Sequence, residues 1–91
     1  MTQTIVSLAK AFGQVAREAR IQIGLTQEAL AHRARLHRTY IGDLENGRKS
    51  PTLDVVEALA SALGSTPHAL IAAAEQRRQT DYLTAPEVGR Q

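Results

Sequence analysis

Residues 25–51 read LTQEALAHRARLHRTYIGDLENGRKSP, and this stretch decides the fold. Thr26 is a good N-cap residue, which predicts a first helix over about residues 26–34. A second helix is predicted from residue 37 or 38 to residue 46, and Gly47 permits the left-handed backbone conformation that ends it. The connection is short enough to force a sharp crossing of the two helices. Two short helices joined in this way form a helix-turn-helix motif.

The same stretch resembles the Cro/repressor (XRE-type) helix-turn-helix family. Matching positions are Thr26, Gln27, Leu30, Ala31, Ala34, Leu36, Ile41, Leu44, Glu45, Gly47 and Pro51. With the helices on either side, the resemblance covers roughly residues 8–74. It implies an all-α, compact five-helix, lambda-repressor-like DNA-binding domain whose second and third helices form the motif. Within the family, the His-Arg-Thr-Tyr segment is most similar to the small controller proteins of restriction–modification systems.

Three further helices are predicted from apolar spacing and from their end signals. The first covers about residues 8–23 and ends at Gly24, and the fourth begins after Thr52 and ends at Gly64. The fifth has Ser65 or Thr66 as its cap and Pro67 in its first turn. We expect a DNA-binding domain over residues 1–75. Residues 76–91 are polar and of mixed charge, which predicts a tail that is mobile or forms a dimer arm.

Composition excludes several other classes of protein. The 91 residues suffice for one domain, and the absence of cysteine excludes a disulfide framework. No apolar run of membrane-spanning length is present, so we expect a cytoplasmic protein with no membrane partner. The net charge is only +2, but the positive residues gather between positions 33 and 49. This distribution favours double-stranded DNA as the partner.

The outward face of the predicted third helix carries Arg38, Thr39 and Asp43, which the resemblance places at base edges. Arginine can bond guanine with two hydrogen bonds, and threonine can donate, accept or contact the thymine methyl group. Asp43 could accept from cytosine N4, or it could orient Arg38 or Arg35.

Eight residues are predicted to contact the DNA backbone, and such contacts position the protein without specifying sequence. They are Thr26, Gln27, Arg35, His37, Tyr40, Asn46, Arg48 and Lys49. Thr26 caps its helix in any case, and Gln27 resembles the family glutamine that bonds a phosphate and braces the third helix. Tyr40 could offer its hydroxyl to a phosphate or belong half to the core.

Two positions depart from the family pattern. The turn usually has glycine where this chain has Arg35, and a non-glycine residue there costs on the order of 1 kcal/mol. Gly42 stands where relatives often have a polar residue. The resemblance also implies a structural ion pair for Glu45, with Arg17 or Arg20; as an exposed pair it would contribute about 0 to 1 kcal/mol.

No enzyme, cofactor or metal site is expected. His32, His37 and His68 have no metal-ligand spacing, and no serine lies in a His–acid arrangement.

We therefore expect a homodimeric transcriptional regulator that binds an inverted repeat. The fifth helix has adjacent Leu70 and Ile71, an apolar stripe too wide for one core, which predicts a dimer interface. Its members are Leu63, Leu70, Ile71 and Ala74. Two alternatives stay open: an antitoxin-like autorepressor that also binds a partner protein, and a protein-interaction module that has lost DNA binding.

Overall fold

Five helices make up the part of the chain that the structure, a computed structural model, describes: residues 6–84. They are α1 (Leu8–Gln22), α2 (Gln27–Ala34), α3 (Arg38–Glu45), α4 (Leu53–Ala62) and α5 (Pro67–Thr84). Residues 6–84 contain no strand. The predicted all-α, five-helix fold is confirmed.

Hydroxyl side chains begin four of these helices. The side-chain oxygens of Ser7, Thr26, Thr52 and Thr66 each accept a hydrogen bond from a backbone N–H in the first turn, at 3.0–3.1 Å. Each bond satisfies a donor that has no partner inside the helix, which is why these residues mark helix starts so reliably. The predicted caps of α2 and α4 are confirmed, and Thr66 rather than Ser65 caps α5.

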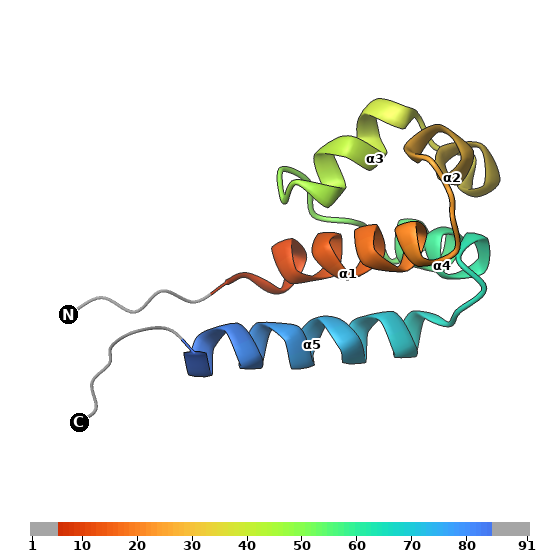
Figure 1. Cartoon of the computed structure of the whole chain (residues 1–91). Coiled ribbons are helices and arrows are strands. Elements are labelled where there is room, and N and C mark those ends of the chain that lie inside the picture. The colour runs from red at the N-terminus through yellow and green to blue at the C-terminus, as the bar shows by residue number, and fades with distance from the viewer. Residues whose placement is uncertain (1–5, 85–91) are drawn as a thin grey trace, which may run out of the picture.

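Helix α1 lies in the middle of the molecule, as Figure 1 shows. Helices α2 and α3 lie above it, and α5 runs beneath it in the opposite direction. The largest side chains that are fully buried come from four helices: Phe12, Leu30, Ile41, Leu44 and Leu59. Because α1 contacts both α3 and α5, the core joins the helix-turn-helix to the rest of the fold.

Helix α5 continues to Thr84, beyond the predicted boundary between residues 75 and 76. Residues 76–84 are therefore helical, in contrast to the tail expected from residue 76. For residues 85–91, which lie outside the described residues, the tail stays a prediction. Two arginines tie this part of α5 to α1 and to the residues just before it. Arg77 forms an ion pair with Glu18, and the Arg78 Nε donates to the Val6 carbonyl at 2.9 Å. Polar anchoring of this kind leaves no apolar pattern in the sequence.

No single helix within residues 6–84 is long and apolar enough to cross a membrane. Helix α4 and the start of α5 meet that length and composition only as a pair, and they are bent by 101° at the break between them.

Candidate nucleic-acid interface

The turn between α2 and α3 depends on Arg35, which holds the left-handed conformation with φ 58° and ψ 44°. The next residue, Leu36, donates its N–H to the Ala31 carbonyl at 2.8 Å, which closes the end of α2. Arg35 is the one non-glycine residue with positive φ in the described part of the chain. The predicted strain at this position is confirmed, since an L side chain is disfavoured in this conformation.

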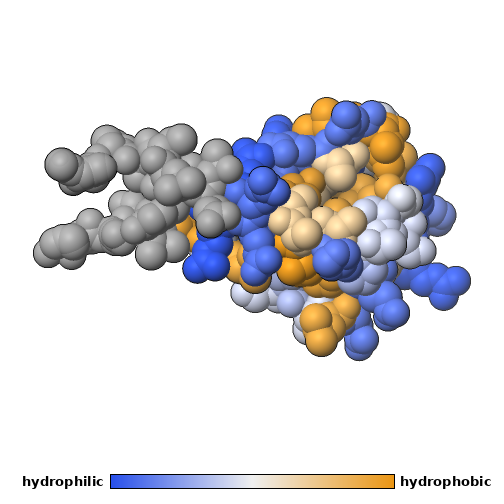
Figure 2. Space-filling view, turned by 90° about the horizontal axis from the view of Figure 1, so that it is seen from below, coloured by the Kyte–Doolittle hydropathy of each residue, from blue (hydrophilic) through white to orange (hydrophobic). Residues whose placement is uncertain are grey.

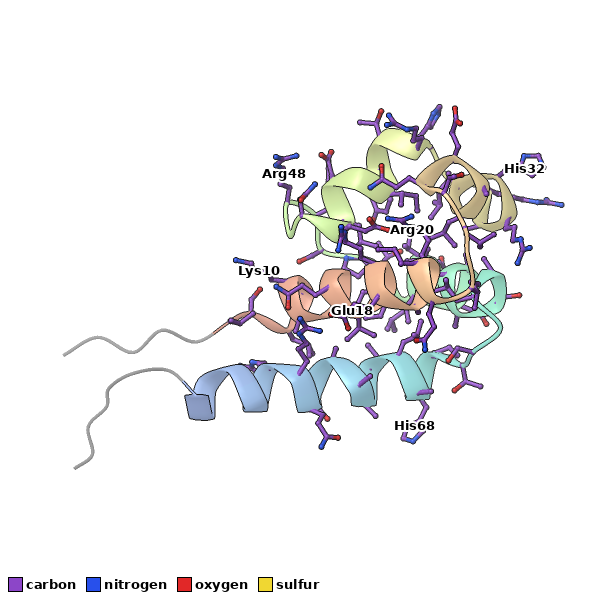
Figure 3. All side chains as sticks on the ribbon, in the orientation of Figure 1. Lys10, Glu18, Arg20, His32, Arg48 and His68 are labelled. Carbon is purple, nitrogen blue, oxygen red and sulfur yellow. The ribbon has the colours of Figure 1, made fainter. Side chains whose placement is uncertain are left out.

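Helix α3 is held against α1 by a buried ion pair between Arg20 and Glu45. The Arg20 Nε lies 2.7 Å from the Glu45 Oε2, and its Nη2 donates to Oε1 at 3.0 Å. A third donor of the same guanidinium, Nη1, bonds the Leu25 carbonyl at 2.7 Å. Gln27 also donates to the Glu45 Oε1, at 3.0 Å, so its expected bracing of α3 is confirmed. Figure 3 shows Arg20 between α1 and the helices above it.

This ion pair decides between the two expected partners of Glu45 and corrects the expected exposure of the pair. Its partner is Arg20 and not Arg17, because Arg20 lies on the side of α1 that faces α3. The pair is also buried, with side-chain exposures of 10% for Arg20 and 1% for Glu45, where an exposed pair was expected. Removing one partner of a buried pair leaves a charge without compensation, so the network is far more important to the fold than a surface pair.

The outward face of α3 presents the residues predicted to contact bases. Arg38 and Thr39 are exposed, and Asp43 is half-buried. The Asp43 Oδ1 lies 3.4 Å from the Arg48 Nη1, so its ion-pair partner is Arg48 and not Arg38 or Arg35. Since Arg48 follows α3, this contact joins the surface predicted to face the bases to the loop predicted to follow the DNA backbone.

Most of the predicted backbone-contacting residues lie at the two ends of α3. His37 begins the helix without a side-chain cap, and Arg48 and Lys49 are exposed beyond its end. Asn46 is partly engaged within the protein, because its Nδ2 donates to the Gly42 carbonyl at 2.8 Å.

Tyr40 takes the half-core placement, and the contact of its hydroxyl with a phosphate stays a prediction. It is half-buried, packed against the core. Burial raises the pKa of its phenol above the ordinary value of 10.0. The hydroxyl therefore keeps its proton at neutral pH and can act as a hydrogen-bond donor.

Gly42 leaves room beside Gln27. A Cβ built on Gly42 would lie 3.9 Å from both side-chain polar atoms of Gln27, which is ordinary van der Waals contact. The packing of α2 against α3 therefore does not require glycine at position 42.

The predicted dimer interface is largely absorbed by the core of the monomer. Leu63, Leu70 and Ala74 are buried and have little surface left for a second copy. Ile71 is half-buried and remains the one candidate of the four. Seen from below, hydrophobic residues still gather on the underside of the molecule, with hydrophilic residues around them (Figure 2). The sequence pattern indicated that Leu70 and Ile71 point in different directions on α5. It did not indicate which of the two residues packs into the monomer core.

Lys10 lies beside the candidate DNA-binding surface at the end of α3, and the sequence did not indicate it. Its aliphatic stem lies against Gly47, directly after α3. Nothing in the helix-turn-helix motif marks Lys10, because it lies outside the motif and is brought there by the packing of α1.

Comparison with known proteins agrees with this geometry. The helix-turn-helix family model HTH_3 matches residues 17–70. The control protein C.BamHI of Bacillus amyloliquefaciens is 43% identical over 61 residues, which cover 66% of this chain and 75% of that protein. The restriction–modification controller protein C.AhdI of Aeromonas hydrophila superimposes with a TM-score of 0.65 at 41% identity, covering 69% of this chain and 94% of that one. The clp gene regulator ClgR of Corynebacterium glutamicum gives a TM-score of 0.82 at 26% identity, covering 86% and 83%.

The match over most of the core defines the class of protein: the chain belongs to the helix-turn-helix family of XRE-type, DNA-binding transcriptional regulators. Among its relatives it is similar to the restriction–modification controllers C.BamHI and C.AhdI.

Proposed function

We propose that this protein is a sequence-specific transcriptional regulator that binds an inverted-repeat operator as a homodimer in the cytoplasm, with α3 in the major groove. The observation that carries the proposal is the outward face of α3, held in place by the buried Arg20–Glu45 pair. A rigidly held helix can present Arg38 and Thr39 to base edges at a constant angle.

The ends of α3 supply the contacts that would position it. Arg35 and His37 precede the helix, and Arg48 and Lys49 follow it, all of them exposed. In the proposed complex these side chains bind phosphates on either side of the groove, together with the Tyr40 hydroxyl and the N-terminal end of α2 at Thr26 and Gln27. Asp43, at the edge of the surface, accepts from a cytosine or holds Arg48 against its target.

A single copy presents few base contacts, which is too little for high specificity. Two copies related by a two-fold axis would read half-sites about 34 Å apart, one turn of the double helix. The similarity to C.BamHI and C.AhdI supports the narrower proposal that the regulated genes belong to a restriction–modification system.

The test separates residues that recognise bases from residues that position the protein. An operator is first selected from a random pool of duplexes, and its single-base variants are then measured with Arg38→Ala and Lys49→Ala. We expect Arg38→Ala to cost about 1 to 3 kcal/mol per half-site and to relax the preference at one base pair. Lys49→Ala should weaken binding to all variants alike. An even loss over all variants for Arg38→Ala would remove Arg38 from the base-contacting set, and failure of selection to enrich any sequence would contradict the proposed function.

A further inference from the structure

The stem of Lys10, in the first turn of α1, packs on the loop that follows α3. A Cβ built on Gly47 would lie 2.9 Å from the Lys10 Cγ and 3.4 Å from its Cβ and Cδ. Gly47 has φ 76° and carries no side chain, so its bare backbone forms the surface on which the lysine methylenes rest. Any other residue at position 47 would have to displace them.

The direction of Lys10 is determined by how α1 is seated. Gly13 allows close contact, since a Cβ there would lie 2.0 Å from the Leu44 carbonyl oxygen. Further along α1, Arg20 is bonded to Glu45 at the end of α3. Positions 10, 13 and 20 lie on one side of a helix with 3.6 residues per turn. The packing of α1 against the C-terminal end of α3 therefore also determines the direction of the Lys10 side chain.

The charge that Lys10 brings is added to a basic loop. Arg48 and Lys49 directly follow Gly47, and all three cationic side chains are exposed. Lys10 forms no ion pair with the side chains that the structure describes, whereas the carboxylate beside the loop, Asp43, is engaged by Arg48. Figure 3 shows Lys10 and Arg48 on the same side of the molecule, at the end of α3.

We propose that Lys10 is a DNA-backbone contact contributed by α1, with its ammonium group bound to a phosphate beside those met by Arg48 and Lys49. The proposal rests on the proposed function and extends the binding surface beyond the helix-turn-helix. A lysine ammonium acts as a point charge on a flexible stem, and here the stem is supported by Gly47. A contact of this kind contributes affinity without sequence preference.

A structural role is the alternative. A cation near the C-terminal end of α3 would also stabilise that helix through its dipole, with or without DNA. The two roles differ in what they change: the structural role alters the unfolding midpoint, and the phosphate contact alters the dependence of binding on salt.

The experiment compares Lys10→Gln and Lys10→Arg with the wild-type protein on two duplexes, the selected operator and a duplex of random sequence. The logarithm of the binding constant is measured against the logarithm of salt concentration. This slope is negative. We expect Lys10→Gln to make it shallower by about 0.9 for each bound copy, on both duplexes. Lys10→Arg should retain the wild-type slope. Arg77→Gln is the charge-matched control. Arg77 belongs to α5, which lies across α1 from α3, so this substitution should leave the slope unchanged.

Each outcome has a defined meaning. A wild-type slope in Lys10→Gln, with a lowered thermal midpoint, would overturn the inference and assign Lys10 to the end of α3. An equal loss of slope in Arg77→Gln would also overturn it, since any lost charge would then suffice. If the wild-type protein itself showed flat salt dependence on both duplexes, the proposed function would fail; if it showed a steep slope that Lys10→Gln left unchanged, only the inference would fail.

Discussion

Arg35 combines a disfavoured backbone conformation with a charge at the proposed DNA surface. Its φ of 58° would suit glycine, and its side chain is exposed and contributes no burial. Backbone strain of this kind persists where something other than stability favours the residue. We expect Arg35→Gly to raise the free energy of unfolding by up to about 1 kcal/mol. It should also weaken the salt dependence of DNA binding. The slope of log binding constant against log salt concentration should become shallower by about 0.9 for each bound copy.

Urea denaturation and salt titration of the same protein measure the two effects. Arg35→Ala is the matched control, since it removes the charge but retains the strained backbone. It should lose the same slope without gaining stability. If Arg35→Gly bound DNA with the wild-type slope, the charge at position 35 would have no part in binding.

At the scale of elements, the crossing of α1 and α3 depends on one glycine. A Cβ on Gly13 would lie 2.0 Å from the Leu44 carbonyl oxygen, a contact that backbone atoms must move to relieve. We expect Gly13→Ala to lower the free energy of unfolding by about 1 to 3 kcal/mol through overpacking. Gly42→Ala makes the same change in α3, where the added Cβ would lie 3.9 Å from the side-chain polar atoms of Gln27.

Gly42→Ala should raise the free energy of unfolding by up to about 1 kcal/mol, because alanine favours a helix interior more than glycine does. Opposite signs for the two substitutions in urea denaturation would support the close crossing. Equal stabilisation by both would show that α1 and α3 do not approach as closely as described.

The Arg20–Glu45 pair fixes the angle of α3, and its loss should be severe. We expect Glu45→Gln to lower the free energy of unfolding by about 3 to 5 kcal/mol, because the Arg20 guanidinium would remain buried without a counter-charge. Asp43→Asn breaks the partly exposed pair between α3 and Arg48, in the loop that follows α3, and should change stability by about 0 to 1 kcal/mol. Chemical denaturation of both variants gives the comparison. Equal losses would mean that the Arg20–Glu45 pair is no more important to the fold than a surface ion pair.

At the scale of the whole molecule, Ile71 is the remaining candidate for the two-fold interface. It is half-buried at the edge of the core, on a helix whose Leu70 and Ala74 already fill the monomer. A charge at position 71 would lack a partner inside a dimer interface, at a cost of several kcal/mol. We expect Ile71→Glu to give a helical monomer, by circular dichroism and sedimentation, with strongly weakened operator binding.

Ala69→Glu is the control for this test. Position 69 is exposed and lies on the opposite flank of α5, so its variant should remain dimeric. If Ile71→Glu still sedimented as a dimer with normal operator affinity, the interface would lie elsewhere, and Leu53, which is 84% exposed, would be the next candidate. If Ile71→Glu unfolded, Ile71 would belong to the monomer core.

What the sequence determined by itself was local. Thr26 and Thr52 marked helix starts, and Arg35 marked the strained turn, because capping and backbone conformation depend on neighbours within one helical turn. The same local signals, with the spacing of apolar residues, placed Arg38 and Thr39 on an outward face.

Tertiary structure decided the contacts between elements distant in the chain. It selected Arg20 over Arg17 as the partner of Glu45, extended α5 to Thr84 through Arg77 and Arg78, and brought Lys10 to the loop after α3. It also turned Leu70 inward and left Ile71 at the edge. Each choice depends on the relative rotation and approach of two packed helices, and side-chain spacing within one helix does not contain that information.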